Sequence, residues 1–489
     1  MRSSTWFRLW TRTPWVGVVL LGACATDELK LAPPRAEVPW PIPQVAPAGS
    51  AGQSGDRVLP QPGQQYALPE LIDMAQRSNP ETRQAWEQAR QAALAVGLAE
   101  SAYAPQLSAE VLGGYQHTPL PIPATLIPKG YFTSDTRELV PALALKWLLF
   151  DFGGRAGAVN AARENSFVAN VAFTGAHQKL IFTVSRDYYA LSAARGKLRA
   201  AEQSLKTAMV VEDAVTERRK NGLATTVDLA QAKRQTAQAR FNRERAIGAE
   251  HAAYEALINS MGVDPGVPME IAEASEQPLP NLPESTVDRY VRDALSSRPD
   301  VVASLGKVRA AEAGVQKERA SHYPTVALAG HAYQNLGDLR SEGSPWYSVD
   351  KPGGDIGVMV SLPLFDGGLR KARDAVANSE LAGARAGLEQ ARDAAIKQVR
   401  DAYDNLKTSL AECAAATALV DASQSAYDSA LDAYRHGVGT YTSLVNEETA
   451  LAQAQADLAS ARSDAMTSAS ALAFATGSIL RGDERPSMN

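Results

Sequence analysis

The sequence predicts a mainly α-helical fold with a small β part, in which long antiparallel helical hairpins carry a few strands at one end. Three observations support this prediction. The chain of 489 residues contains an internal duplication, and each copy holds an unusually long helical stretch. In each copy, two short segments with alternating apolar residues precede that stretch.

The duplication is defined by landmarks that recur at a constant offset. Phe150-Asp151 returns as Phe365-Asp366, in each case followed by a Gly-Gly pair, and Gly222 returns as Gly437 at the same offset. Such agreement over a long span indicates two structural repeats built on one plan. We therefore assign 68–282 to the first repeat, 283–480 to the second repeat and 481–489 to a C-terminal tail.

The long helical stretches predict extended hairpins. Gly154 to Lys220 contains no proline and, at about 1.5 Å per residue, would extend roughly 100 Å as a helix. In the second repeat, largely apolar positions from Val399 to Tyr434 advance by alternating steps of four and three, which is typical of a coiled-coil seam. Cys413 lies on this seam, so packing is its expected role. A helix of this length cannot bury its seam alone, so we expect a wall of packed helices.

The alternating segments predict four strands. Leu143, Leu145, Trp147 and Leu149 share one face of a segment, and the stretch from Ile356 to Ser361 repeats this pattern. The expected partners are Gln106 to Gln116 and Thr325 to Asn335, joined through loops at His117 to Arg137 and Leu336 to Gly353. Each strand is close to the ~9–11 residues that span a bilayer when tilted. For any single pair, a soluble hairpin packed on helices is the alternative.

Four strands cannot close a barrel by themselves. Open strand edges are not tolerated in lipid, so other copies of the chain must complete the sheet if it crosses a membrane. Oligomerisation follows from this argument, although the number of subunits does not.

The N-terminus resembles a bacterial lipoprotein signal. A positive region with Arg2, Arg8 and Arg12 precedes a short apolar run that ends in Leu21-Gly22-Ala23-Cys24. The resemblance implies that 1–23 is a removed signal peptide and that Cys24 carries lipid in the outer membrane. An ordinary signal peptide is the alternative. The proline-rich segment 24–67 is expected to be a tether with little regular structure.

Composition excludes several classes of function. The net charge of −5 is spread along helical stretches, so nucleic acid is not an expected partner. The two cysteines and six histidines show no metal-ligand spacing, and no nucleophile elbow or phosphate-binding loop is present. We therefore expect no enzyme activity, no cofactor and no metal site.

The ensemble of duplicated elements resembles the TolC family of outer-membrane efflux factors. The features that carry the resemblance are the repeated Leu-Phe-Asp with its glycine pair, Asn221-Gly222 at the end of the first long helix, and the segment His436 to Thr440 at the end of the second. The resemblance covers about Leu68 to Leu480 and includes the lipoprotein subtype.

Membership of that family implies a homotrimer with a 12-stranded outer-membrane β-barrel and an α-helical barrel in the periplasm. It implies a channel that works with an inner-membrane pump and a periplasmic adaptor to export small molecules such as drugs or metals. Export of a polypeptide by a type I secretion system is the first alternative. A lipid-anchored structural coiled-coil protein is the second.

The resemblance also implies roles for residues at the two helix reversals. The adaptor is expected to dock at a tip formed by Asn221, Gly222, Gly437, Gly439 and Thr440. An entrance gate is expected at Asp228, Tyr441 and Glu448. Asp228 matches an acidic position of the family, but Tyr441 replaces the usual arginine partner. Glu448 is expected either in an acidic ring on the trimer axis or, alternatively, on the solvent-facing outer wall.

Overall fold

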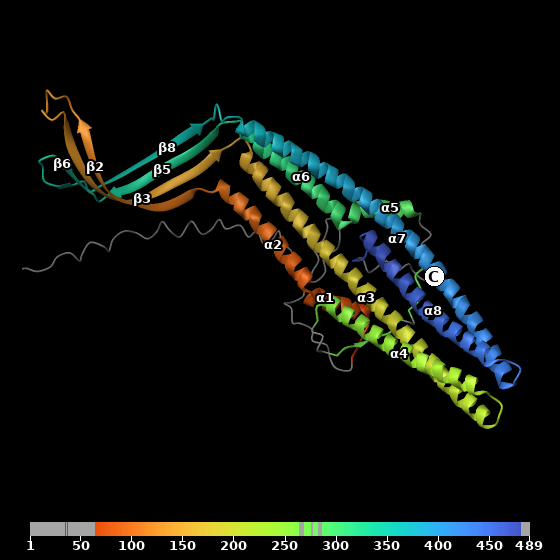
Figure 1. Cartoon of the computed structure of the whole chain (residues 1–489). Helices are drawn as coiled ribbons and strands as arrows, with labels where there is room; N and C mark the ends of the chain where they lie inside the picture. Colours follow the sequence, from red (N-terminus) through yellow and green to blue (C-terminus); the bar gives the residue numbers. More distant parts are fainter. Residues whose placement is uncertain are drawn as a thin grey trace, which may run out of the picture.

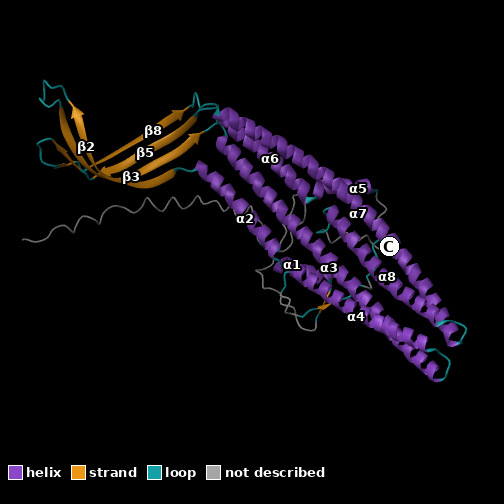
Figure 2. Cartoon of the chain, in the orientation of Figure 1, coloured by secondary structure: helices purple, strands orange, loops and turns teal. Residues whose placement is uncertain are grey.

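The structure is a computed structural model that describes residues 35, 37, 64–263, 268–274, 277–281 and 286–480. A long layer of helices carries a small β-sheet at one end (Figures 1 and 2). The longest helices are α3 (Gly154–Lys220) and α7 (Leu369–Arg435), each with 67 residues. The predicted mainly α-helical fold is therefore confirmed, and α3 has the predicted bounds.

Each repeat adds two short helices and one returning helix to its long helix. The first repeat contributes α1 (Leu68–Ser78), α2 (Pro80–Glu100) and α4 (Thr226–Met261). The second contributes α5 (Val287–Ser297), α6 (Pro299–Ala320) and α8 (Tyr441–Ala475). A short 3-10 helix, η3 (Ser101–Tyr103), ends α2. None of the described helices combines the length and apolarity needed to cross a bilayer.

The helices form a wall with α3 at its centre. Near the sheet, α3 lies between α2 and α6, and α7 packs on the other side of α6. Toward the far end, α4 and α8 take the places of α2 and α6 beside α3 (Figure 1). The wall has exposed apolar side chains on both outer helices, with Leu98 on α2 and Val376 on α7 exposed at 77% and 57%.

The same turn opens both long helices. Gly153 and Gly368 adopt φ values of 94° and 90°, in the left-handed region that favours glycine. The Asp151 carboxylate accepts a hydrogen bond from the Arg155 backbone N–H at 2.6 Å, which satisfies an otherwise unpaired donor in the first turn. In the second repeat, Asp366 accepts the equivalent bond from Arg370 at 3.2 Å.

The sheet contains four long antiparallel strands in the order β2, β3, β5 and β8. Their bounds are Gln106–Pro121, Tyr131–Phe150, Thr325–Asn335 and Lys351–Ser361. The short strands β6 (Asp338–Ser341) and β7 (Tyr347–Ser348) continue the sheet beside the outer part of β3. The four strands predicted from sequence are thus confirmed.

The register of the strands builds one continuous apolar face. Leu145 on β3 lies opposite Leu107 on β2 and Gly330 on β5, and Gly330 lies opposite Ile356 on β8. Because side chains alternate along a strand, this register collects the apolar positions of all four strands on one side. They are Leu107, Ala109, Val111, Pro141, Leu143, Leu145, Trp147, Leu328, Ala332, Ile356, Val358 and Val360.

The opposite face carries the polar positions of the same strands. Glu110, Lys146, His331 and Asp355 lie on it, together with small residues. This is the pattern of a sheet with lipid on one side and a polar interior on the other.

Two sequence predictions about connections are wrong. Most of the expected loop His117 to Arg137 is strand, because β2 runs to Pro121 and β3 begins at Tyr131. Similarly, the expected loop Leu336 to Gly353 contains β6, β7 and the start of β8. Polar side chains in these outer segments hide the strand pattern.

The end of the predicted tether is also structured. β1 (Gln65–Tyr66) pairs in parallel with β4 (Glu270–Ile271), so these two residues belong to the folded body. Tyr66 is buried at 4% exposure in a cluster with residues of α1, α3 and α4, and this burial explains the ordering of the segment. The 1–23 signal and Cys24 lie outside the described residues.

Candidate functional site

The two helix reversals at the far end of the wall are built alike. Gly222 and Gly437 adopt φ values of 73° and 79°, which allow the chain to leave α3 and α7 through left-handed turns. Gly439 is needed for another reason. A Cβ atom there would lie 2.9 Å from the Tyr434 backbone nitrogen, so any side chain would push the reversal away from the end of α7.

Threonine N-caps start both returning helices. Thr225 and Asp228 form a reciprocal capping box, in which each side chain accepts the other's backbone N–H, at 2.8 and 3.1 Å. Thr440 accepts the Ser443 N–H at 3.1 Å. The bonds from Thr225 lower the pKa of the Asp228 carboxyl. Asp228 is therefore an anionic cap of its own helix.

Arg218 connects the two reversals. Its guanidinium donates a hydrogen bond to the Tyr434 carbonyl oxygen at 3.1 Å and lies 4.9 Å from the centroid of the Tyr434 ring. Arg218 is in the last turn of α3, whereas Tyr434 is in the last turn of α7, so this contact joins one hairpin to the other. Nothing in the sequence identifies it, because Arg218 sits in a basic run typical of any helix C-terminus.

Tyr441 is a core residue of the tip. It is 8% exposed and its ring lies 6.3 Å from the Tyr434 ring in an edge-on arrangement. Val211 and Val215 of α3 and Leu444 of α8 complete this apolar cluster. Burial raises the pKa of Tyr441 to about 12, so the phenol stays neutral. Tyr441 thus contributes apolar packing, and not charge, to the tip.

Glu448 lies inside the wall. The side chain is only 4% exposed, and one carboxylate oxygen accepts a hydrogen bond from the Ser204 hydroxyl of α3 at 3.1 Å. The other oxygen is buried and has no hydrogen-bond partner among the described residues. Desolvation raises the pKa of Glu448 to about 7, although the Ser204 bond opposes part of that shift.

This position differs from both sequence expectations for Glu448, the ring on the trimer axis and the outer wall. The physical reason is its phase on α8, four residues after the fully buried Leu444, which turns the side chain toward α3. The acidic ring therefore stays a prediction, and it requires the side chain to leave this position.

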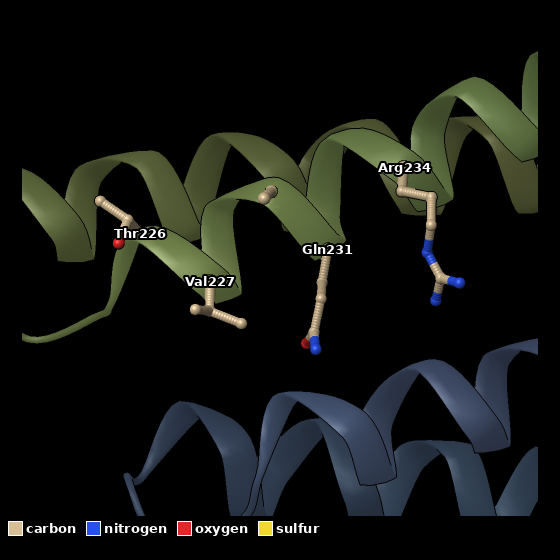
Figure 3. Close-up of a pocket in the computed structure, with 5 residues that line it drawn as sticks. Thr226, Val227, Gln231 and Arg234 are labelled. Carbon is tan, nitrogen blue, oxygen red and sulfur yellow. The ribbon is translucent and has the colours of Figure 1, made fainter.

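A hollow of about 340 Å³ lies on the α4 side of the tip. Thr226, Val227, Gln231 and Arg234 surround it, and Figure 3 shows Val227, Gln231 and Arg234 pointing toward the second hairpin, drawn in blue. A longer groove of about 1010 Å³ lies between α4 and α8, with alanines of α3 among its lining residues and polar side chains such as Asn242 and Gln453 around it. The two returning helices face each other across this groove, where Gln235 of α4 donates a hydrogen bond to Thr449 of α8 at 3.5 Å, and α3 packs against both helices.

The structure places all five predicted tip residues in the two helix reversals, namely Asn221, Gly222, Gly437, Gly439 and Thr440. Of the predicted gate residues, Tyr441 and Glu448 are buried near each other on α8, whereas Asp228 caps its own helix. Within the described part of the chain, no group of histidine, cysteine and acidic residues is placed to hold a metal ion.

Comparisons with known proteins agree with this architecture. The family model described as outer membrane efflux protein matches residues 71–263 and 290–478. The chain is 30% identical to Protein CyaE of Bordetella pertussis, covering 81% of this chain and 80% of CyaE. It is 26% identical to the outer membrane protein OprJ of Pseudomonas aeruginosa, covering 73% of each. The solved CmeC outer membrane channel of Campylobacter jejuni superimposes with a TM-score of 0.72 at 18% identity, covering 89% of this chain and 94% of that one.

A sheet with one apolar face at the end of a long helical wall defines a transport protein of the outer membrane whose helical part lies in the periplasm. The chain belongs to the outer membrane efflux protein family. The two matched segments correspond to the two repeats, and the resemblance inferred from sequence is confirmed.

Proposed function

We propose that three copies of this chain form the exit duct of a tripartite efflux system, together with a periplasmic adaptor and an inner-membrane pump. The duct carries small molecules such as drugs or metals and is passive, with no catalytic step of its own. The adaptor docks at the tip formed by the two reversals. Cys24 carries the lipid that anchors the proline-rich tether.

The apolar face of the sheet is the observation that carries this proposal. On a single copy of the chain, the side chains of Val358, Val360 and Ile356 are each exposed at 62% or more. Contact of such an apolar patch with water is unfavourable, which indicates that it faces lipid. The strands β2 and β8 are the outer members of the four-stranded sheet, so neighbouring copies can pair with both. Four strands from each of three subunits close a 12-stranded barrel.

The edges of the helical wall support the same assembly. Leu94 and Leu98 of α2 are exposed at one edge, and Val376 and Leu419 of α7 at the other. Joining the α2 edge of one subunit to the α7 edge of the next would bury both sets. The helical barrel then continues the strand barrel.

Opening of the duct requires the two hairpins of each subunit to part at the tip. The Arg218 contact with Tyr434 and the burial of Glu448 against Ser204 oppose this motion. Both contacts join α3 to the second hairpin. They therefore take the place of the ion pair that the family's usual arginine would make.

Two neighbouring substitutions on β8 test the duct directly. Val358→Arg puts a charge on the apolar face, where a cation near the middle of the bilayer costs about 2–4 kcal/mol. Met359→Arg puts the same charge on the polar face. We expect the parent and Met359→Arg to form channels in planar bilayers, with Met359→Arg shifted toward anions, whereas Val358→Arg inserts poorly. Equal insertion of both variants, or a parent protein that never conducts, would refute the proposal.

A further inference from the structure

The apolar face of β3 becomes charged toward the outer end of the sheet. Trp147, Leu145, Leu143 and Leu139 share this face, but the next position outward on the same side is Arg137. At about 3.4 Å per residue, Arg137 lies roughly 7 Å beyond Leu139 along the strand. Since the helices lie in the periplasm, this end of the sheet faces the outer leaflet, and Arg137 reaches the depth of its headgroups.

Two guanidinium groups lie close to one indole ring at this depth. The Arg137 Cζ lies 4.2 Å from the centroid of Trp346, and the Arg340 Cζ lies 4.8 Å from it. Trp346 comes from the turn between β6 and β7, and Arg340 from β6. We call Arg137, Arg340 and Trp346 the outer cluster.

One part of the outer cluster has a structural role. The Arg340 Nε donates to the Asp135 carboxylate at 3.0 Å and so pins β6 to β3. The Tyr115 hydroxyl donates to the same carboxylate at 2.7 Å, and His117 hydrogen-bonds to it at 2.6 Å. Asp135 is 6% exposed, and both of its carboxylate oxygens already accept hydrogen bonds from neighbouring side chains.

Arg137 takes no part in the contact between Arg340 and Asp135 that holds β6 to β3. Among the described residues, no carboxylate forms an ion pair with it, although Asp338 lies opposite on β6. The Arg137 side chain is exposed. It therefore presents a guanidinium with free donors on the lipid side of the sheet, held in place by the indole face.

We propose that the outer cluster binds the phosphorylated headgroup of an outer-leaflet lipid. Guanidinium groups match phosphate oxygens through two parallel hydrogen bonds, and tryptophan is the side chain that favours the membrane interface. Arg137 supplies the phosphate contact and the net positive charge, because Asp135 neutralises Arg340, and Trp346 orients the Arg137 guanidinium. The bound lipid would seal the junction between the barrel and its outer loops.

Arg137→Gln in the purified full-length protein tests this site, with native mass spectrometry as the measurement. The probe is bisphosphorylated lipid A, compared with the same lipid after removal of its phosphates. Loss of one interfacial arginine should weaken retention of the phosphorylated lipid about five- to tenfold. Trp346→Leu should weaken it in the same direction. The matched control is Lys351→Gln, which removes a cation at a similar height on the opposite face of the sheet.

The site is overturned if Arg137→Gln retains the phosphorylated lipid as well as the parent does. Equal binding of the dephosphorylated lipid would also contradict it, because phosphate is the group recognised. Inorganic phosphate serves as a competitor. If it displaces the lipid at equal concentration, the cluster is a site for the free anion and not for a lipid.

Discussion

The two repeats share a backbone plan, yet they hold different positions in the wall. In the first repeat, α3 is packed on both sides by other helices, whereas the equivalent α7 of the second repeat packs mainly against α5, α6 and α8. The difference shows at repeat-equivalent positions. Gly157 of α3 has no room for a side chain against α6, while the matching Ala372 of α7 is exposed.

The junctions between short helices diverge in the same way. Asn79 precedes α2 and donates to the Ser260 carbonyl near the end of α4 at 2.9 Å. Its counterpart Arg298 precedes α6 and donates to the Ala475 carbonyl at the end of α8 at 3.0 Å. In both repeats a left-handed glycine follows, at Gly262 and Gly477. The glycine is retained where the backbone demands it, while the side chain that binds the helix end has changed.

This comparison distinguishes the residues that build each hairpin from the residues that hold the two hairpins together. Features that both repeats keep, such as the glycine turns and threonine caps, build each hairpin. Features found once, such as the Arg218 contact and the buried Glu448, join one repeat to the other. We therefore expect substitutions of the first kind to affect folding and substitutions of the second kind to affect opening.

The largest effect is expected at the closest approach of two helices. A Cβ atom on Gly157 would lie 2.8 Å from the Lys317 backbone nitrogen and 2.9 Å from the Ala313 carbonyl oxygen. Gly157→Val should therefore destabilise the protein by about 3 kcal/mol or more, since neither backbone can move alone. Ala372→Val, at the equivalent position of α7, should cost less than about 1 kcal/mol. Denaturation of both variants measures the difference, and equal losses would break the comparison.

A smaller and pH-dependent effect is expected at Glu448. Its pKa of about 7 lies above the ordinary value of 4.5, so the folded state holds the proton more tightly than the unfolded state. Stability from this group is complete below about pH 4.5, falls between pH 4.5 and 7, and is lost above pH 7. The total is on the order of 3 kcal/mol.

Glu448→Gln removes this dependence. The facing groups are Ser204 of α3, Tyr427 of α7 and Tyr441 of α8, and none of them titrates in this window. The variant should match the parent at pH 4 and be more stable at pH 8, with slower hydrogen exchange in the first half of α8. Glu447→Gln removes a neighbouring carboxylate as a control. An unchanged pH profile in Glu448→Gln would show that the buried carboxyl does not act on stability.

Much of the fold could be predicted because its periodicities are long. Sixty-seven residues of uninterrupted helix leave a clear pattern, and four strands with one apolar face leave another. The outer parts of β2 and β3 were not predictable in this way, since His117, Asp135 and Arg137 give no apolar alternation beyond the lipid band. Their pairing depends on the strand register and not on hydrophobicity.

Only those parts of the candidate site whose residue type is determined by backbone geometry could be predicted from the sequence. Gly222 and Gly437 could be placed at the reversals because left-handed turns favour glycine. The burial of Glu448 follows from its helical phase beside Leu444, but a charged residue on a seam suggests a lumen before it suggests a core. The Arg218 contact depends on how two distant hairpins meet, which no local pattern records.

The central claim is that the contacts between repeats hold the entrance closed. Arg218→Leu removes both the hydrogen bond and the ring contact to Tyr434, which together contribute about 1–2 kcal/mol in each subunit. The adjacent Arg219→Leu removes an exposed cation and serves as the control. Single-channel conductance in planar bilayers is the measurement. The account predicts a several-fold rise for Arg218→Leu with no change for Arg219→Leu, and identical conductance in the parent and both variants would contradict it.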